Sequence, residues 1–214
     1  MFSSLSSQLR KELGEKVVLA LNRNNFKAFF CKDRSEALLE IKRMIPSGSS
    51  VGTGGSMTIS EMGMVPFLIK MGHKILDHNI PGSCDLQKNM IRKARLTCDV
   101  FLTSANAVTI DGQLVNTDGL GTRIAPMVFG PKRVIVVAGV NKIVENVDDA
   151  MKRIMHIAAP MNNRRRMRPN PCTQTGECID CSGPERICNV TCILHKRPPL
   201  SDIHVLIVGE RLGF

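Results

Sequence analysis

Hydrophobic residues recur along the chain at two spacings, and segments with these spacings alternate. The first segment has an apolar residue at every fourth position, at Leu5, Leu9, Leu13, Val17 and Leu21. This spacing predicts an amphipathic helix. Asp33 and Glu36 form a capping-box pair that opens a second helix, which Pro46 ends. Further helices are expected around residues 56–71, 86–94 and 151–159.

Short apolar runs of the strand type lie between these helices, at residues 26–31, 49–53, 73–77, 99–105, 133–138 and 203–208. The run from Arg133 to Ala138 is rich in β-branched residues, which is typical of a central parallel strand. Asp111-Gly112 favours a tight turn between two more short strands, so a hairpin is expected there. Strands that alternate with helices predict an α/β fold with a mostly parallel sheet and helices on both faces.

One segment, residues 164–199, breaks this alternation. It is rich in Pro, Cys, Arg and Gly, shows no clear period, and holds five of the eight cysteines. We interpret it as a Cys-rich loop insertion near the C-terminus, organised by something other than apolar packing. The sequence therefore predicts one α/β domain over residues 1–214 that contains this insertion.

The composition indicates the cellular compartment and argues against membrane insertion and nucleic-acid binding. The hydrophobic fraction of 43% suffices for a large core, but the longest apolar run, Val134 to Val140, is too short for a membrane span. The N-terminal residues lack the apolar region of a signal peptide, so a cytoplasmic protein with reduced thiols is expected. The net charge is +10, yet the chain has no Trp or Tyr for base stacking. Nucleic-acid binding is therefore disfavoured, and we interpret the basic run Arg164–Arg168 as a solvated face.

A glycine-rich turn follows the second predicted strand, at Gly52, Thr53, Gly54, Gly55 and Ser56. Glycines let backbone amides approach an anion, and a helix start adds partial positive charge. The turn matches neither the Walker A loop nor the dinucleotide-binding pattern. Phosphate or carboxylate binding is one interpretation, and a tight turn without a ligand is the other.

Other strand ends carry residues that suit the same role. The carboxyl ends of parallel strands form one edge of a sheet, so these residues are expected to meet at an anion pocket. The candidates there are Asn106, Asp118, Gly119, Arg123, Asn141 and Lys142. Arg123 suits a carboxylate or phosphate, while Lys142 suits a point charge or a base. Glu61 and Asp118 are the candidate carboxylate bases, although Glu61 also fits a structural role. Ordinary turn chemistry is the alternative for the whole set.

The five clustered cysteines have the spacing Cys172-x5-Cys178-x2-Cys181-x6-Cys188-x3-Cys192. Cys178 and Cys181 form a pair that can direct two thiolates at one metal, and two further thiols would complete four ligands. Cys172, Cys178, Cys181 and Cys188 are one set, and the last four cysteines are the other. Zinc and an iron–sulfur cluster both suit such ligands, and unliganded reduced thiols are the alternative. The remaining cysteines, Cys31, Cys84 and Cys98, are interpreted as small buried residues.

Several motifs together resemble the LUD-domain family, the lactate-utilisation proteins of the C type. The motifs are residues 51–58, 104–107 with 109–112, 116–123, 140–143, and Cys172–Cys181 with Arg186–Cys188. The resemblance covers nearly the whole chain. It implies a Rossmann-like fold similar to ribose-5-phosphate isomerase, glucosamine-6-phosphate deaminase and coenzyme A transferases. Lys142 corresponds in place to a functional lysine of the isomerases, but their Asp-Gly-Ala-Asp-Glu pattern is absent, which argues against sugar-phosphate isomerisation.

The resemblance implies a component of bacterial lactate utilisation, in which lactate is oxidised to pyruvate with iron–sulfur partner subunits. It does not assign a catalytic step to this chain. Two alternatives remain open. One is a stand-alone enzyme on a sugar phosphate or acyl-CoA, with Glu61 or Asp118 as base and Lys142 on the anion. The other is a non-catalytic regulator that senses a metabolite.

Overall fold

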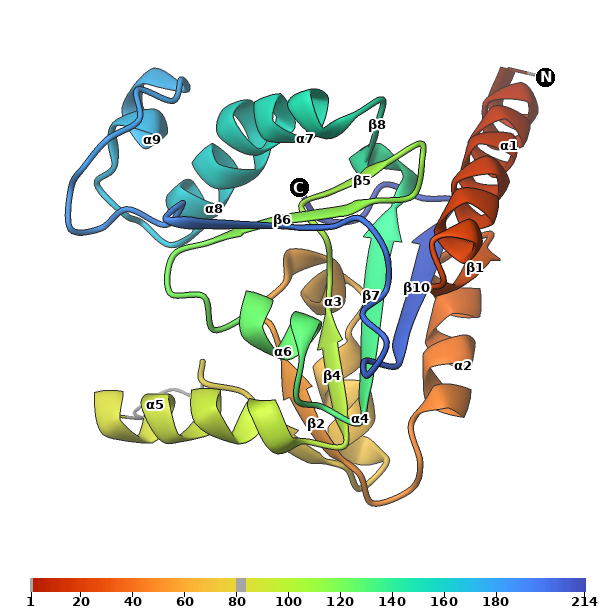
Figure 1. The fold of residues 1–214 in the computed structure, drawn as a ribbon, viewed down its shortest axis with the longest axis horizontal. Coiled ribbons are helices and arrows are strands. Elements are labelled where there is room, and N and C mark those ends of the chain that lie inside the picture. The colour runs from red at the N-terminus through yellow and green to blue at the C-terminus, as the bar shows by residue number, and fades with distance from the viewer. Residues whose placement is uncertain (1, 80–83) are drawn as a thin grey trace.

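The fold has a larger and a smaller β-sheet, and strands β5 and β6 of the smaller one run across the carboxyl end of β7 in the larger one (Figure 1). The computed structural model describes residues 2–79 and 84–214. The larger sheet has six parallel strands in the order β1-β10-β7-β4-β2-β3. These strands are β1 (Lys27–Cys31), β2 (Ser50–Thr53), β3 (Lys74–Leu76), β4 (Val100–Thr103), β7 (Arg133–Gly139) and β10 (Ile203–Val208). The predicted α/β class and parallel sheet are confirmed.

The larger sheet is buried on both faces, and β7 shows how the sequence achieves this. Successive side chains of a strand point to opposite faces. Val134 and Val136 pack on the side of α1 (Phe2–Arg23), whereas Ile135 and Val137 pack on the other side. Helices α2 (Arg34–Met44), α3 (Met57–Glu61) and α4 (Met64–Lys70) cover that other side. The continuous apolar runs in the sequence therefore predicted these buried strands correctly.

The smaller sheet shares the side of α1 and has the order β8-β5-β6-β9. Its strands are β5 (Ala107–Thr109), β6 (Leu114–Asp118), β8 (Ile143–Val144) and β9 (Val190–Leu194). The antiparallel pair β5 and β6 is the expected hairpin, with Gly112 at a φ of 84° in its turn. Strand β9 lies within the Cys-rich segment, residues 164–199. It pairs antiparallel with β6 along its whole length, so the Cys-rich segment is tied into the sheet.

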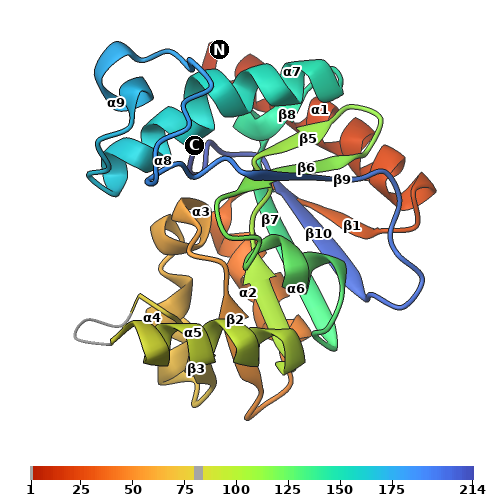
Figure 2. The same cartoon turned by 60° about the vertical axis from the view of Figure 1, so that its left-hand side comes forward.

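A long, bent helix covers the outer face of the smaller sheet (Figure 2). It consists of α7 (Val147–Arg153), a π-helical turn at Ile154–Ala158 and α8 (Ala159–Arg165). Ala150 and Ile154 pack against Ala107 and Val115 of the sheet. The helix expected at residues 151–159 thus extends to Arg165 because the π turn continues it. The short helix α9 (Pro171–Thr175) follows within the Cys-rich segment.

Helix α5 (Asp85–Ala94) lies at the end of the fold away from α7, and α6 (Ile124–Val128) lies between α5 and the smaller sheet (Figure 1). Cys84 is the N-cap of α5 and is exposed, which corrects its interpretation as a buried residue. Cys31 and Cys98 are buried as expected, at 0% and 2% exposure.

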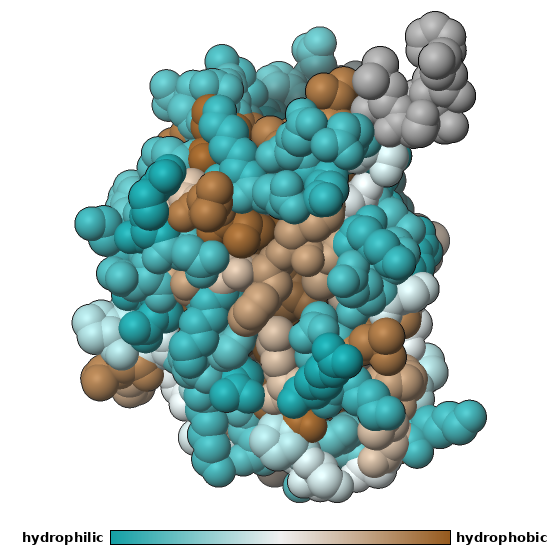
Figure 3. All heavy atoms as spheres, turned by 90° about the vertical axis from the view of Figure 1, so that its right-hand side faces the viewer, coloured by the Kyte–Doolittle hydropathy of each residue, from teal (hydrophilic) through white to brown (hydrophobic). Residues whose placement is uncertain are grey.

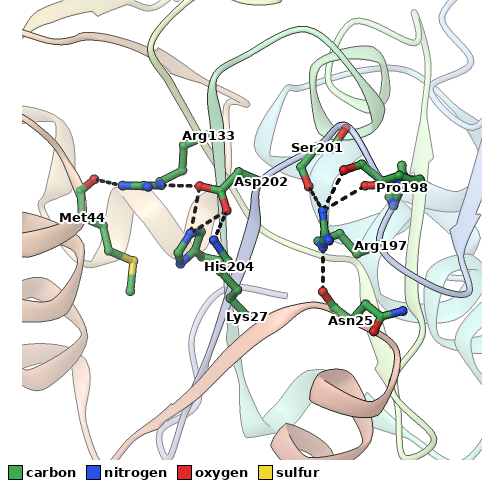
Figure 4. Close-up of polar contacts among 10 residues, drawn as sticks. Asn25, Lys27, Met44, Arg133, Arg197, Pro198, Ser201, Asp202 and His204 are labelled. Atoms are coloured by element: carbon green, nitrogen blue, oxygen red, sulfur yellow. Dashed lines mark hydrogen bonds and ion pairs between the residues drawn. The ribbon is translucent and has the colours of Figure 1, made fainter.

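The amino ends of β1, β7 and β10 are held together by one acidic residue, Asp202 (Figure 4). Its carboxylate accepts hydrogen bonds from Lys27 Nζ at 2.6 Å, Arg133 Nε at 2.8 Å and His204 Nε2 at 3.1 Å. Arg133 also donates to the carbonyl of Met44 at 2.7 Å. Burial raises the pKa of Asp202, but the bonds from Lys27 and Arg133 outweigh it and hold this pKa well below its usual range.

The face that carries α1 and β1 mixes apolar and polar side chains (Figure 3). Leu13 and Phe29 are among its exposed apolar residues, and the Phe29 ring stacks on His204 with centroids 6.3 Å apart. β1 is an edge strand of the larger sheet, and its Lys27 is exposed there, which disfavours pairing with another chain. Within residues 2–79 and 84–214, no helix combines the length and the apolar character needed to cross a bilayer.

Candidate functional site

A cavity of about 410 Å³ lies at the carboxyl edge of the larger sheet. The loops that follow β2, β4 and β7 contribute to its wall, as does the loop after β6. The remaining wall comes from α5, α8 and residues 184–189 of the Cys-rich segment. Parallel strands direct their following loops to one edge, so residues far apart in the sequence meet here.

The glycine-rich turn forms one side of this cavity. Gly54, Gly55 and Ser56 line it, while Gly52 and Thr53 lie inside β2 and do not. A Cβ on Gly54 would lie 2.6 Å from Thr103 Oγ1, so the chain packs too closely there for any side chain. Ser56 caps α3, but α3 spans only Met57–Glu61. Such a short helix has little dipole, so anion binding must rest mainly on side chains.

Lys142 is a deeply buried charge in the cavity wall, at 3% exposure. Its Nζ donates to Thr58 Oγ1 at 2.8 Å, Ser104 Oγ at 2.9 Å and the Ala105 carbonyl at 3.2 Å. Burial lowers the pKa of Lys142 to about 7, and the positive charges of Arg153 and Arg123 act in the same direction. The amine is therefore partly neutral at physiological pH, as a base or nucleophile requires.

Arg123 and Asn106 are fixed to each other beside Lys142. Arg123 donates to Asn106 Oδ1 at 3.1 Å and to the Thr117 carbonyl at 2.5 Å. The Asp118 carboxylate accepts from the backbone amides of Gly119 and Arg123, each at 2.8 Å. Asp118 thus shapes the turn that carries Arg123, and both residues line the cavity. Burial lowers the pKa of Arg123.

Two arginines from the α5 region face the glycine turn across the cavity. Arg95 is 1% exposed and donates to the Leu76 carbonyl at 3.3 Å and to His78 Nδ1. Burial lowers the pKa of Arg95 to about 10, and burial together with Arg95 lowers the pKa of His78 to about 4. His78 is therefore neutral at pH 7. Arg92 Nε is buried and has no hydrogen-bond partner among the described residues.

The basic run Arg164–Arg168 is largely exposed, as expected of a solvated face, and it also borders the cavity. Arg165, Arg166 and Arg168 all line the cavity wall. Arg165 donates to Asn162 Oδ1 at 2.8 Å, and Arg168 pairs with Glu185. The guanidinium of Arg166 forms no hydrogen bond or ion pair with any residue that the structure describes. Burial lowers its pKa, and the neighbouring Arg165 adds to the effect.

The structure separates the expected site residues into two groups. The residues in the cavity wall are Gly54, Gly55, Ser56, Asn106, Asp118, Gly119, Arg123 and Lys142. Glu61 lies outside the wall, is exposed, and accepts a hydrogen bond from the Gly213 amide at 2.7 Å. Asn141 also lies outside it and binds the backbone of Leu212 and Gly213. Sequence reasoning missed Arg92, Arg95 and His78, because no local pattern marks residues that reach a site from a neighbouring helix.

The wall of this cavity carries an excess of positive charge. Two carboxylate side chains in its wall, Asp118 and Glu185, are outnumbered by eight cationic ones. The cationic residues are Arg92, Arg95, Arg123, Lys142, Arg165, Arg166, Arg168 and Arg186. Such an excess of positive charge around a concave surface attracts anions with more than one negative charge.

The Cys-rich segment forms a second, smaller cavity next to the first. Cys172, Cys178, Cys181 and Cys188 all line it, and Arg186, Ile187 and Cys188 line both cavities. Cys192 lies in β9 and pairs with Asn116. Burial raises the pKa of the Cys188 thiol, and the other three thiols add to this while Arg186 opposes it. Within the described residues, no three His, Cys, Asp or Glu side chains already form a group that could hold a metal ion.

Comparisons with known proteins agree with this architecture. The fold is similar to the crystal structure of a DUF162 family protein from Deinococcus radiodurans, with a TM-score of 0.54 and 14% identity over 93% of this chain and 98% of that one. No functionally curated protein matches the chain significantly. The family model of the LUD domain matches residues 14–208. The chain therefore belongs to the LUD-domain family.

Proposed function

We propose that this protein binds a small, multiply charged phosphorylated anion in the cavity at the carboxyl edge of the larger sheet. The observation that carries the proposal is the excess of eight cationic side chains over two carboxylates in the cavity wall. Arg92 and Arg166 support it further, because a buried Nε and a whole guanidinium there lack partners among the described residues. An anion would bind these donors, and the desolvation of the buried Arg92 Nε is otherwise uncompensated.

Size and charge favour a phosphorylated ligand over a simple hydroxy acid. The cavity of about 410 Å³ lies in the range of sites for ligands of roughly drug size. A single carboxylate such as lactate would neutralise one of the cations and leave most of the volume to water. A phosphate ester, a pyrophosphate or the phosphate part of an acyl-CoA would engage several arginines at once.

We further propose that this binding serves lactate utilisation. The family assignment supports the proposal, because the motifs that carry the family resemblance supply cavity residues: Gly54, Asn106, Arg123 and Lys142. In this role the chain is an accessory component that works with iron–sulfur partner subunits while they oxidise lactate. Deleting its gene should slow growth on lactate and leave growth on pyruvate unchanged. Equal growth of the deletion strain on lactate would overturn this role.

Thermal unfolding tests the binding proposal directly, with inorganic pyrophosphate as the probe and circular dichroism as the readout. At a concentration about 100 times the dissociation constant, stabilisation of about 2.7 kcal/mol is expected. For a chain of this size that corresponds to a rise in Tm of about 5–10 °C. Sodium lactate at the same ionic strength should give a much smaller rise.

Three variants, each of which removes one positive charge, test where pyrophosphate binds. Arg92→Gln and Arg166→Gln each remove one cavity cation and should weaken pyrophosphate binding about 10- to 100-fold. Arg10→Gln removes the same charge from the exposed surface of α1, outside the cavity wall, and serves as the control. Equal weakening in all three variants would point to unspecific charge screening, and it would contradict a defined site.

A further inference from the structure

Four of the five clustered thiols converge on one small space in the Cys-rich segment. Cys172 lies in the first turn of α9 and is 9% exposed, and Cys178, Cys181 and Cys188 are half-buried. All four line a cavity of about 10 Å³. That volume admits about one water-sized sphere, so the space suits a single ion better than a cluster of several iron atoms.

Polar groups of neighbouring residues hold the segment that carries these thiols. Asn163 Nδ2 donates a hydrogen bond to Cys172 Sγ at 3.2 Å, and Asn163 is itself 1% exposed. Arg186 donates to the Cys181 carbonyl at 2.5 Å and to the Cys188 carbonyl at 3.1 Å. The Asn163 amide therefore donates directly to one thiol, while Arg186, which also pairs with Asp180 at 2.6 Å, holds the backbone of two others in place.

The cluster is also anchored to the body of the protein. Asn170 Nδ2 donates to Asn163 Oδ1 at 2.9 Å and to the Glu185 carbonyl at 2.8 Å. Asn163 belongs to α8, so this relay joins a rigid helix to the loop that carries Cys188. Residues 176–189, by contrast, contain no helix or strand. The loop therefore has the freedom to close around an ion while its base stays fixed.

We propose that Cys172, Cys178, Cys181 and Cys188 form a tetrathiolate site for one metal ion of the zinc type. Binding forms four metal–sulfur bonds and releases the thiol protons to solvent, with no change in oxidation state. Because no three of the thiols yet form a metal-binding group, the ion draws the loop together as it binds. Cys192 is excluded, since it lies in β9 and does not line the small cavity.

Metal analysis of the reduced protein, purified without oxygen, tests the site. About one zinc per chain is expected for the wild type. Cys178→Ser and Cys181→Ser should lose the metal, whereas Cys192→Ser is the matched control from the same segment and should keep it. As a second readout, Co²⁺ added to the metal-free wild type should give the intense visible absorption of a tetrahedral thiolate complex.

Several results would overturn the proposal. Wild-type protein that binds neither zinc nor Co²⁺ would exclude the site, whatever the variants do. Loss of metal in Cys192→Ser with retention in Cys172→Ser would assign the other set of four cysteines. Iron, inorganic sulfide and a band near 400 nm would replace the single ion with an iron–sulfur cluster. Trypsin cleavage after Arg186 gives an independent check, because zinc should slow it in the wild type and leave its rate unchanged in Cys181→Ser.

Discussion

The ammonium group of Lys142 donates a 2.8 Å hydrogen bond to the hydroxyl of Thr58, which lies 84 positions away in the chain. Together with its bonds to Ser104 and the Ala105 carbonyl, this contact uses all three ammonium hydrogens on protein acceptors. No carboxylate is among those acceptors. Burial and the nearby Arg153 and Arg123 therefore lower the pKa of Lys142 to about 7.

Lys142 should give the stability of the protein a distinct pH dependence. Its pKa is about 7 when folded and about 10.4 when unfolded, so between these values the unfolded chain binds more protons. Stability therefore rises with pH from about 7 to 10 and loses this contribution below 7. Lys142→Met removes the group. The free energy of unfolding in urea should rise by about 1–3 kcal/mol more in the wild type than in the variant over this range. Parallel curves for the two proteins would contradict the lowered pKa.

Lys142 should also react with a phosphorylated aldehyde. Pyridoxal phosphate brings a phosphate to the cavity, where the neutral amine attacks the aldehyde carbon and water leaves to give an imine that borohydride reduces. At pH 7.5 mass spectrometry should find most of the label on Lys142, since exposed lysines are almost entirely protonated. Pyrophosphate should protect the residue, and Lys142→Met should leave the site unlabelled. Label spread evenly over surface lysines would count against a reactive amine in an anion site.

The carboxyl-edge residues were predictable because parallel topology alone brings strand ends together. Gly54, Asn106 and Lys142 each directly follow a strand or its turn, so the strand pattern sufficed to place them in one cavity. Glu61 was named for its closeness in sequence to the glycine turn. However, α3 carries it to the exposed side, where it binds the Gly213 amide.

The residues that sequence reasoning missed depend on contacts between distant elements. Arg95 reaches the cavity because α5 packs beside β3, a relationship that no local pattern encodes. β9 was missed because Val190–Leu194 is short and lies among cysteines, and its pairing with β6 depends on the turn chemistry of the whole Cys-rich segment. The arginine run Arg164–Arg168 could be seen in the sequence, but the direction in which its side chains point depends on the helix before it.

The hairpin turn should tolerate no side chain at Gly112. Its φ is 84°, and a Cβ would lie 2.5 Å from the backbone carbon of Ala20 and 2.6 Å from the amide nitrogen of Leu21 in α1. Gly112→Ala should therefore destabilise the fold by about 2–5 kcal/mol, through backbone strain and overpacking together. Gly48→Ala is the control, because Gly48 has a similar φ of 72° but open space around it. Its cost should be about 1 kcal/mol, so equal losses in urea denaturation would refute the packing argument.

Removal of the ion from the proposed tetrathiolate site should weaken anion binding. Arg186, Ile187 and Cys188 line both cavities, so an ion that fixes Cys188 also fixes part of the wall that meets the anion. The affinity for pyrophosphate, measured by calorimetry, should fall about 10-fold in metal-free protein, and pyrophosphate should raise the affinity for zinc by the same factor. Cys192→Ser should behave as the wild type. Unchanged pyrophosphate affinity after chelation would show that the two sites are independent.

The single π-helical turn at Ile154–Ala158 sets the direction in which the arginine run faces. Each residue of an α-helix turns the chain by about 100°, so the one extra residue of a π turn offsets everything after it by roughly that angle. If the same residues formed a continuous α-helix, Arg165 and Arg166 would point about a quarter-turn away from the cavity. A substitution that returned this turn to α-helical geometry, with every arginine kept, would move the positive charges away from the cavity.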